Sequence, residues 1–504
     1  MSSSARGNGA TAASGAGPAT VPASRRGWIL TVASVASFMV ALDLLVVTTA
    51  LDTIRHDLDA STSALQWTVT AYSVSFASLL MTGAALGDRF GRRRTMIAGL
   101  VTFAIGSGGA ALSGSVGELI AARIVQGVGG AVILPLGLTI VTTAFPQERR
   151  ASAIGILEGV SGLAVIAGPV VGGVVTQYLT WEWVFWVNVP IALLAVPVVL
   201  AVVDESYGPD KTLDGMGLLL VSGAAVAVVW GLVRGNDIGW TDPEIVAALG
   251  LGAALGAAFI AWERTAHQPM LPLRFFRSRS FSVGVTAAFL LAAALYGSVF
   301  FMAQFIQVTL GEDSFGAGLR LLPWTGTLFV TAPLAGAVAD RIGHRLVLSA
   351  GLLLQAAGTA WLALLVGADL SYTAMIAPLV VAGVGTSAAL PVSQAAIVSA
   401  VTESELGKAA GTNNMIQELG GAFGVAAGVA IFTVAGSYTS PAAFADGFAA
   451  ALGVSAGLAT LGFAAALLLP GRATPSPPPD TLATGVGAPD GPAVLVPADT
   501  GSRP

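Results

Sequence analysis

The sequence has no cysteine and only three histidines, and both scarcities narrow the chemistry open to the chain. Without cysteine there is no disulfide, no thiol catalysis and no Cys-ligated metal site. His56, His267 and His344 lie far apart in the sequence, so a histidine-based metal site is not expected. Any chemistry must come from other side chains.

Charge is also scarce, because only 10% of the 504 residues are charged while 55% are hydrophobic. A soluble chain carries roughly a quarter charged residues. Apolar runs of about 18 residues or more recur along the sequence, and such runs are long enough to cross a bilayer. The strands of transmembrane β-barrels are short and alternate apolar with polar residues, so they do not account for these long apolar runs. We therefore predict an all-α polytopic membrane protein. The net charge of −5 gives no indication of a nucleic-acid partner.

Signatures of nucleotide binding and catalysis are missing as well. No Gly-Lys-Ser/Thr sequence follows the Gly-rich stretches, so ATP is not expected. No Ser/His pair, metal cluster or soluble catalytic domain is recognisable. An intramembrane enzyme or a sensor is therefore a remote alternative, and we expect neither a cofactor nor a metal.

Hydropathy predicts about fourteen membrane spans between two disordered cytosolic tails, residues 1–26 and 471–504. The first tail is rich in Ser, Ala and Gly, and the second in Pro, Gly, Thr and Ala. The expected spans are 27–50, 66–86, 95–113, 117–141, 151–175, 184–203, 214–233, 244–263, 282–309, 317–337, 346–367, 373–398, 408–434 and 447–469.

The basic residues test this topology, because cytosolic loops carry most of the Lys and Arg of a membrane protein. With the N-terminus in the cytosol, the opposite loops hold only Arg55, Arg234 and Arg320. This asymmetry predicts an even number of spans with both termini inside. The cytosolic loops hold Arg89, Arg92, Arg93, Arg94, Arg149, Arg150, Lys211, Arg264, Arg274, Arg277, Arg279, Arg341, Arg345, Lys408 and Arg472.

A short motif occurs twice, each time at the cytosolic end of an apolar stretch: GDRFGRRR at 87–94 and ADRIGHR at 339–345. The aspartates Asp88 and Asp340 are 252 residues apart (340 − 88). Six spans need only about 200 residues, and one extra helical hairpin accounts for the surplus. The repeat predicts two six-helix bundles, 27–203 and 265–470, with an inserted hairpin at 204–264. Duplicated bundles of this kind mostly move small solutes by rocking one half against the other.

Six segments occur in an order that resembles one family of transporters. They are LDLLVVTTAL at 42–51, ALGDRFGRR at 85–93, ARIVQGVGG at 122–130, GPVVGG at 168–173, WVFWVNVP at 183–190 and LDGMG at 213–217. They resemble motifs of the major facilitator superfamily, and more narrowly of its fourteen-spanner drug:proton antiporters of the multidrug and quaternary-ammonium efflux type. The resemblance covers essentially the whole chain between the tails. Thr48 and Asp52 stand where that family usually has Asn and Pro, so substrate choice stays open.

Asp43 and Arg123 are the first candidates for chemistry, because a charged side chain at bilayer depth costs about 2.5–3.5 kcal/mol on insertion scales. Asp43 lies about seven residues before the outer end of its predicted span, and Arg123 about six after the outer start of its own. Both then lie roughly 10 Å below the outer surface, so we expect them to share one polar network. A structural hydrogen bond for Asp43 and snorkelling for Arg123 are the alternatives.

Further polar residues fall within other predicted spans. Glu158 and Glu418 are candidates for binding a proton or a substrate, although a satisfied structural acid is an alternative for each. Aromatic and amide groups in the ninth span could line a cavity, but core packing or lipid contact is the commoner role of such a stripe. The candidate coupling or substrate residues are Asp43, Gln126, Arg123, Glu158, Gln304, Gln307, Asn413, Asn414 and Glu418.

The repeated motif and the Gly-Pro segment are predicted to gate rather than to bind. Asp88 and Asp340 can cap a helix or pair with basic groups across the bundle and so latch one conformation. Small residues let helices approach closely, and proline bends a helix. The expected gating residues are Asp88, Arg89, Gly91, Arg92, Gly168, Pro169, Gly172, Gly173, Asp340 and Arg341.

The sequence is thus interpreted as a monomeric, proton-coupled exporter of hydrophobic or cationic drugs or antibiotics in the cytoplasmic membrane. Coupling to protons is implied by the resemblance and by the buried carboxylates. A proton symporter that imports a nutrient is the main alternative, although the helix-5 motif is typical of antiporters. Apart from membrane lipid and the transported molecule, no partner is expected.

Overall fold

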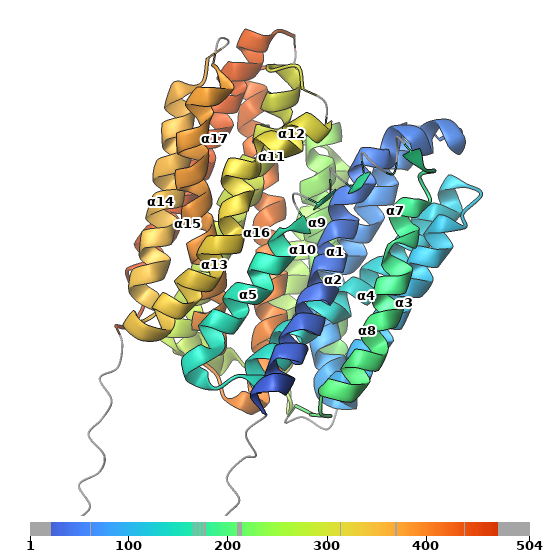
Figure 1. The fold of residues 1–504 in the computed structure, drawn as a ribbon, viewed down its shortest axis with the longest axis vertical. Helices are drawn as coiled ribbons and strands as arrows, with labels where there is room; N and C mark the ends of the chain where they lie inside the picture. Colours follow the sequence, from blue (N-terminus) through green and yellow to red (C-terminus); the bar gives the residue numbers. More distant parts are fainter. Residues whose placement is uncertain are drawn as a thin grey trace, which may run out of the picture. The chain divides into compact units, whose positions relative to one another are not determined.

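A computed structural model describes residues 22–471, except 61, 165–166, 169–170, 173–174, 176–177, 209–213, 313, 368–369 and 438. This part of the chain is helical and contains no strand (Figure 1). Its α-helices are α1 (Ala23–Asp57), α2 (Thr62–Phe90), α3 (Arg92–Ala111), α4 (Val116–Ala144), α5 (Arg150–Gly162), α7 (Trp183–Trp186), α8 (Asn188–Val202), α9 (Gly215–Ile238), α10 (Pro243–Glu263), α11 (Arg279–Val308), α12 (Ser314–Arg320), α13 (Leu322–Ile342), α14 (His344–Leu365), α15 (Tyr372–Val398), α16 (Leu406–Ala435) and α17 (Pro441–Ala466). Short 3-10 turns are η1 (Gln147–Arg149), η2 (Leu273–Arg277) and η3 (Glu403–Glu405).

Helices occur at all fourteen predicted spans. Twelve candidate spans within the described residues are long and apolar enough to cross a membrane. The other two positions are those of α3, which opens on three arginines, and α5, which is described as continuous helix only to Gly162. The polytopic character of the chain therefore follows from its helices as well as from its composition.

The first predicted boundary was wrong at both ends, because α1 runs from Ala23 to Asp57 instead of 27–50. Residues 23–26, assigned to the disordered tail, are helical. Arg25 fixes this first turn by donating to the Val202 carbonyl at 2.8 Å and to Asp204 at 2.5 Å. At its other end α1 continues to the exposed residues Arg55, His56 and Asp57. These residues are polar, so the hydropathy of this last part of the helix is too low for it to be predicted as part of a membrane span.

Two other predicted spans contain a break. The 317–337 span consists of α12 and α13, and Pro323 lies in the first turn of α13. The 184–203 span consists of α7 and α8, which are separated at Val187 three residues before Pro190. Proline has no N–H to donate, so the helical hydrogen bonding of the preceding turn is incomplete at both places.

Glycine ends the helix in both copies of the repeated motif. Gly91 lies between α2 and α3 with φ 103°, and Gly343 lies between α13 and α14 with φ 96°. Backbone in this region is strained for residues with a Cβ atom, which is why each motif carries glycine there. The repeat therefore makes the same tight helix–helix turn in each half of the chain.

The helices pack into two groups, α1–α8 and α11–α17, here called the N-half and the C-half. The halves meet where α5 packs against α13 and α15, and where α2 and α4 pack against α16. Small residues permit close contact there: a Cβ at Gly155 would collide with the Ala332 backbone, and one at Gly336 with the Ala151 backbone. The inserted helices α9 and α10 pack on each other, and α9 also contacts α2 and α16.

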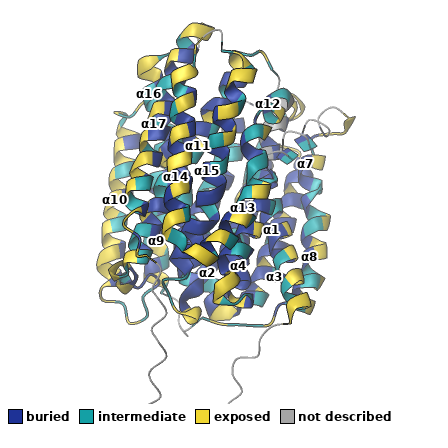
Figure 2. Ribbon diagram, turned by 60° about the vertical axis from the view of Figure 1, so that its left-hand side comes forward, coloured by how far each residue is buried: buried dark blue, intermediate teal, exposed yellow. Residues whose placement is uncertain are grey.

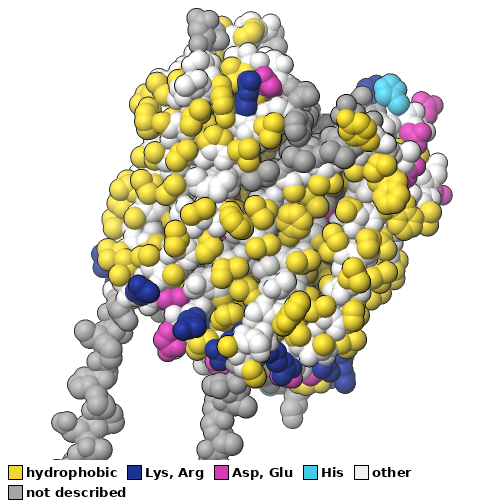
Figure 3. All heavy atoms as spheres, in the orientation of Figure 1, with side chains coloured by type: hydrophobic (Ala, Val, Ile, Leu, Met, Phe, Trp, Pro, Cys, Tyr) yellow, Lys and Arg dark blue, Asp and Glu magenta, His cyan; other side chains and the backbone are white. Residues whose placement is uncertain are grey.

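One end of the described bundle is rich in arginine, and we call it the basic end (Figure 3). Here α1 begins and α2 and α13 finish. Exposed residues lie on the outward-facing helix surfaces (Figure 2), and hydrophobic side chains cover much of the face drawn in Figure 3. Leu364 (87% exposed) and Val434 (82%) are among the exposed apolar residues, as expected for contact with lipid. The basic end holds Arg25, Arg89, Arg92, Arg93, Arg94, Arg149, Arg150, Arg341, Arg345 and Lys408.

The apolar core differs between the two ends. Toward the basic end, two buried clusters join residues of both halves; one of them packs Ile154 of α5 with Ala335 of α13. Toward the opposite end, the described buried residues form separate clusters, one around Phe185 in the N-half and one around Phe305 in the C-half. Among the residues that the structure describes, the halves thus share apolar clusters toward the basic end and have separate clusters toward the other end.

Candidate functional site

A fully buried ion pair joins α1 to α4. Arg123 donates from Nη1 to Oδ2 of Asp43, and both side chains are 0% exposed. Arg123 Nε also donates to the Thr68 carbonyl of α2 at 3.2 Å. A buried charge is tolerated when it is paired and hydrogen-bonded, and this pair meets both conditions. The structure therefore brings together the two residues that the cost of burial singled out.

Amide side chains complete the network around Asp43. Gln126, one turn after Arg123, accepts from Arg123 Nη1 at 2.8 Å and donates to Asp43 Oδ1 at 2.9 Å. Asn188 of α8 donates to the same Oδ1 at 2.8 Å, and Gln126 also donates to Ser107 of α3 at 2.7 Å. The network thus spans α1, α2, α3, α4 and α8, so a change at Asp43 is felt across the N-half.

Aromatic rings close the space around Arg123. Its guanidinium lies 4.1 Å from the ring centroid of Tyr72 and 5.8 Å from that of Phe185. Such contacts stabilise a desolvated cation by about 2 kcal/mol or more. Tyr72, Phe185, Asn188 and Ser107 were not proposed as site residues. Asn188 belongs to the WVFWVNVP segment at 183–190, and its position as a polar residue inside an apolar run could have indicated a site residue.

The position along the helix agrees with the prediction for Arg123 and differs from it for Asp43. Arg123 lies seven residues into α4, or about 10 Å from its start, as expected. Asp43 lies fourteen residues, or about 21 Å, before the end of α1, because that helix continues beyond its predicted span. The two side chains meet where α1 packs against α4, with more of α1 than of α4 extending beyond the network.

A second group of polar residues lies where the halves meet. Glu158 of α5 accepts from Gln394 Nε2 of α15 at 3.0 Å, which links the N-half to the C-half. Tyr296 of α11 interacts electrostatically with both Glu158 and Glu418. Among the described residues, no Lys or Arg forms an ion pair with either glutamate. Glu158 therefore lies at this junction and Glu418 lies on α16, one of the helices that meet there; both are half-buried, and neither has a cationic ion-pair partner among the described residues.

The remaining candidates along α16 and α11 occupy different surroundings. Gln417 donates to Asn413 at 3.2 Å, and Asn413 donates to Asn414 at 3.2 Å, forming a polar ladder one turn before Glu418. Tyr72 interacts electrostatically with Glu418 as well as with Asp43 and Arg123, which couples the charges of the two polar groups. Gln304 is half-buried and Gln307 is exposed, and both lie in the last two turns of α11.

The aspartates of the repeated motif face the opposite half. Asp340 of α13 accepts from the backbone N–H groups of Ala151 (3.2 Å) and Ser152 (3.1 Å), which form the first turn of α5. A carboxylate at a helix N-terminus satisfies free amides and complements the helix dipole. Asp340 thus ties the C-half to the N-half at the basic end, as Arg150 does with Glu403 at 2.7 Å.

Asp88 occupies the corresponding place in the other half. It accepts from Arg92 Nε at 3.0 Å, and a Cβ on Gly407, in the first turn of α16, would strike both of its carboxylate oxygens. Only glycine lets Asp88 come so close to this helix start. Each motif aspartate thus meets the first turn of a helix of the other half.

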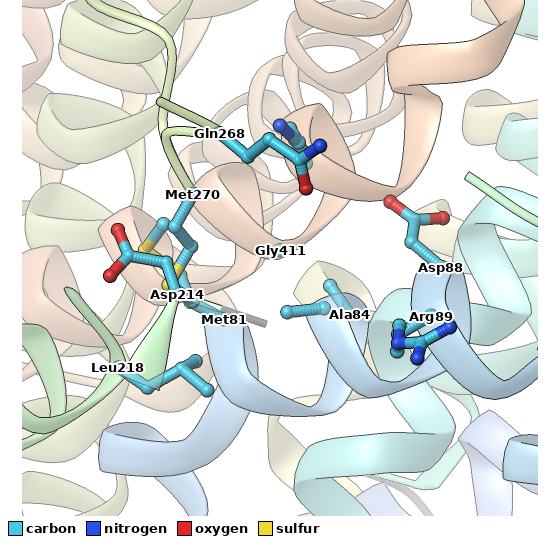
Figure 4. Close-up of a pocket in the computed structure, with 11 residues that line it drawn as sticks. Met81, Ala84, Asp88, Arg89, Asp214, Leu218, Gln268, Met270 and Gly411 are labelled. Carbon is cyan, nitrogen blue, oxygen red and sulfur yellow. The ribbon is translucent and has the colours of Figure 1, made fainter. Parts of the chain in front are cut away.

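The region around Asp88 contains a cavity of about 30 Å³ lined by α2, α9, α16 and the segment 268–270 (Figure 4). Asp88 and Arg89 border it from α2, and Asp214 borders it from α9. It has room for one or two water molecules and is too small for a drug. We therefore assign it to the contact between halves and not to substrate binding.

The other expected gating residues have varied positions. Gly91 and Arg92 are buried, whereas Arg89 and Arg341 are exposed at the basic end. The basic residues after Asp88 have a clear anchor, because Glu205 accepts from the Arg93 backbone N–H at 3.0 Å and lies 3.5 Å from Arg94. Gly168 and Gly172 are buried, while the predictions for Pro169 and Gly173 lie outside the described residues.

We expect Asp340→Asn to loosen the basic end, because it removes the charge that caps α5. A cap of this kind is worth about 1 kcal/mol, so a cysteine at Ala332 should react with a soluble maleimide about 5-fold faster. The chain has no native cysteine to interfere. Asp446→Asn, which changes an exposed carboxylate of α17, is the matched control. Equal labelling rates in the two variants would contradict a role for Asp340 in holding the two halves together.

Comparison with known proteins decides the family. The chain matches the Major Facilitator Superfamily profile over residues 33–330 and 286–498. The chain belongs to this superfamily. It is a multi-pass membrane transporter and not an enzyme, and the predicted all-α major facilitator fold is confirmed.

Relatives and solved structures agree with the assignment. The chain is 35% identical to the tetracenomycin C resistance and export protein of Streptomyces glaucescens over 81% of this chain and 77% of that one. It is 32% identical to the cephamycin export protein CmcT of Amycolatopsis lactamdurans, covering 89% and 93%. The proton:xylose symporter XylE superposes with a TM-score of 0.63 at 16% identity, over 88% of this chain and 95% of that one, which supports the fold alone.

Proposed function

We propose that this transporter is a proton-coupled antiporter that exports hydrophobic, amine-bearing drugs or antibiotics by alternating access. The observation that carries the proposal is a pair of half-buried carboxylates, Glu158 and Glu418, on helices that meet at the junction of the halves, without a cationic ion-pair partner among the described residues. A carboxylate removed from water needs a proton or a cation. One site can therefore bind either, but not both at once.

The orientation follows from the distribution of arginine. Cytosolic loops carry the excess of basic residues, so the basic end faces the cytosol. Both termini are then on the cytosolic side of the cytoplasmic membrane. The apolar core that joins the halves there closes the cytosolic side in this conformation. We propose that the carboxylates are reached from the opposite side, where the described apolar clusters of the two halves are separate.

The proposed cycle uses competition at these glutamates. With the outside open, a proton binds Glu158 or Glu418, neutralises it and releases the cationic substrate outward. When the halves rock, the proton leaves to the cytosol and a new substrate cation takes its place. The proton is the coupling ion, no other cofactor is required, and a single copy of the chain performs the cycle.

The Asp43–Arg123 network links proton binding to the rocking motion. Protonation of a carboxylate in contact with this network, or of Asp43 itself, changes the charge that holds Arg123. Tyr72 lies against Arg123 and interacts electrostatically with Glu418, and through this ring the network would respond to the charge of the binding site. Freed from its acceptor, Arg123 lets the helices of the N-half shift as a unit.

The test uses purified protein in vesicles with an imposed pH gradient and ethidium, a fluorescent lipophilic cation. Transport should follow the size and sign of the gradient, and an acidic exterior should drive ethidium out of the compartment that corresponds to the cytosol. A drug-susceptibility panel in an efflux-deficient host, with Asp43→Asn as the inactive control, then defines the substrates. Ethidium movement that ignores the gradient would contradict proton coupling.

A further inference from the structure

The inserted helix α9 contacts α2 of the N-half at two positions along its length. Near the basic end, Thr82 Oγ1 lies 3.2 Å from Ser222 Oγ. Toward the other end, the rings of Trp67 and Trp230 meet with centroids 4.8 Å apart. One contact is a hydrogen bond and the other an aromatic pair, and together they fix both the position and the rotation of α9 on α2.

The inserted pair is itself tied together at both ends. Glu244 at the start of α10 accepts from Trp230 Nε1 at 2.9 Å and lies 3.5 Å from Arg234 Nε. At the basic end, Trp262 Nε1 of α10 donates at 2.8 Å to Asp214, the residue that caps α9. Any motion of α9 is therefore transmitted to α10.

Toward the C-half the pair has a different attachment, through Lys408 of α16. Lys408 Nζ donates to the Pro269 carbonyl at 2.6 Å. The same segment is fixed to α10, because the buried carboxylate of Glu263 accepts from the backbone N–H groups of Met270 and Leu271, both at 3.1 Å. Lys408 also interacts electrostatically with Glu263. These contacts all lie at the basic end.

From this arrangement we infer that α9 and α10 move with the N-half as one body, and that Lys408 is a releasable hook by which they hold the C-half at the basic end. The inference rests on the proposed rocking cycle. When the basic end opens, α16 leaves α2 and α9 together. The Lys408–Pro269 hydrogen bond then breaks while the Thr82–Ser222 contact persists.

The first test cross-links α9 to α2 in the full-length protein, which has no native cysteine. Thr82→Cys/Ser222→Cys replaces two hydroxyls in contact, and Thr327→Cys/Ser387→Cys does the same within the C-half, where the hydroxyls are 3.0 Å apart. Ala84→Cys/Gly411→Cys joins α2 directly to α16. Gradient-driven ethidium transport is measured after oxidation and again after reduction.

Oxidised Thr82→Cys/Ser222→Cys should transport at the rate of the oxidised within-half control, whereas the α2–α16 cross-link should stop transport until it is reduced. Loss of transport in the oxidised Thr82→Cys/Ser222→Cys protein, reversed by reduction, would overturn the inference, because it would show that α9 must leave α2. If proton-driven transport were itself wrong, the reduced proteins would also ignore the gradient, so the two failures are distinguishable.

The second test releases the hook. Lys408→Met should raise the maleimide reactivity of a cysteine at Ser152, in the first turn of α5 between the halves, about 5-fold, the factor for losing about 1 kcal/mol of contact. Arg264→Met, which removes an exposed charge from the same segment, should leave it unchanged. Equal labelling of the two variants would exclude Lys408 as a hook.

Discussion

Replacing Arg123 by alanine abolishes gradient-driven export and lowers the thermal stability of the protein, because Asp43 is left buried with its charge unpaired. Breaking a buried ion pair in this way costs about 3–5 kcal/mol. Arg123 and Asp43 are both 0% exposed, so water does not replace the lost partner. Ethidium flux in vesicles and the thermal unfolding temperature of the purified protein measure the two effects.

The double variant Asp43→Asn/Arg123→Gln separates folding from function. It removes both charges and keeps groups that can hydrogen-bond to each other and to Gln126 and Asn188. We expect most of the lost stability to return, while gradient-driven export stays absent because no charge changes at this position. Full proton-driven efflux by Arg123→Ala would refute the role of the network.

The second large effect is expected from Glu158→Gln combined with Glu418→Gln. The double variant removes both carboxylates at the junction of the halves and should reduce export of ethidium by about 100-fold or more, since each charged contact in a desolvated site is worth about 1.5–3 kcal/mol. Glutamine at 158 can still hydrogen-bond with Gln394, so the contact between the halves is retained. Vesicle flux and minimum inhibitory concentrations report the loss.

Comparison with the single variants and with a matched control shows what the glutamates do. Each single variant should retain part of the export, because the other carboxylate remains. Glu148→Gln, at an exposed position of η1, is the matched control. Unchanged transport by the double variant would show that neither glutamate binds the proton or the substrate.

The sequence predicted those features that follow from local patterns and from the cost of burial. Apolar runs gave the helices, and the isolated charges Asp43 and Arg123 pointed to a shared network because neither is stable alone in lipid. Neutral polar residues cost less to bury, so Asn188, Ser107 and Tyr72 gave only a weak signal. The contact of Gln394 with Glu158 depends on how α5 packs against α15, and sequence spacing does not fix that register.

Helix ends were less predictable than helix cores. Hydropathy ended the first span where polar residues begin, yet α1 continues for another seven residues to Asp57. The repeated motif gave the positions of Asp88 and Asp340 but not their partners, since the first turns of α16 and α5 belong to the opposite half. Such partners become visible only when the two halves are assembled.

The unequal distribution of the apolar core has a consequence for inhibition. Phe185 and Phe305 are each fully buried within the cluster of their own half, so these two cores can change their separation as whole bodies when the halves rock. A rigid, flat compound wedged between those clusters would hold them apart and arrest the pump without competing for either glutamate. Resistance to such a blocker would arise by shortening bulky side chains on these two surfaces, leaving the carboxylates untouched.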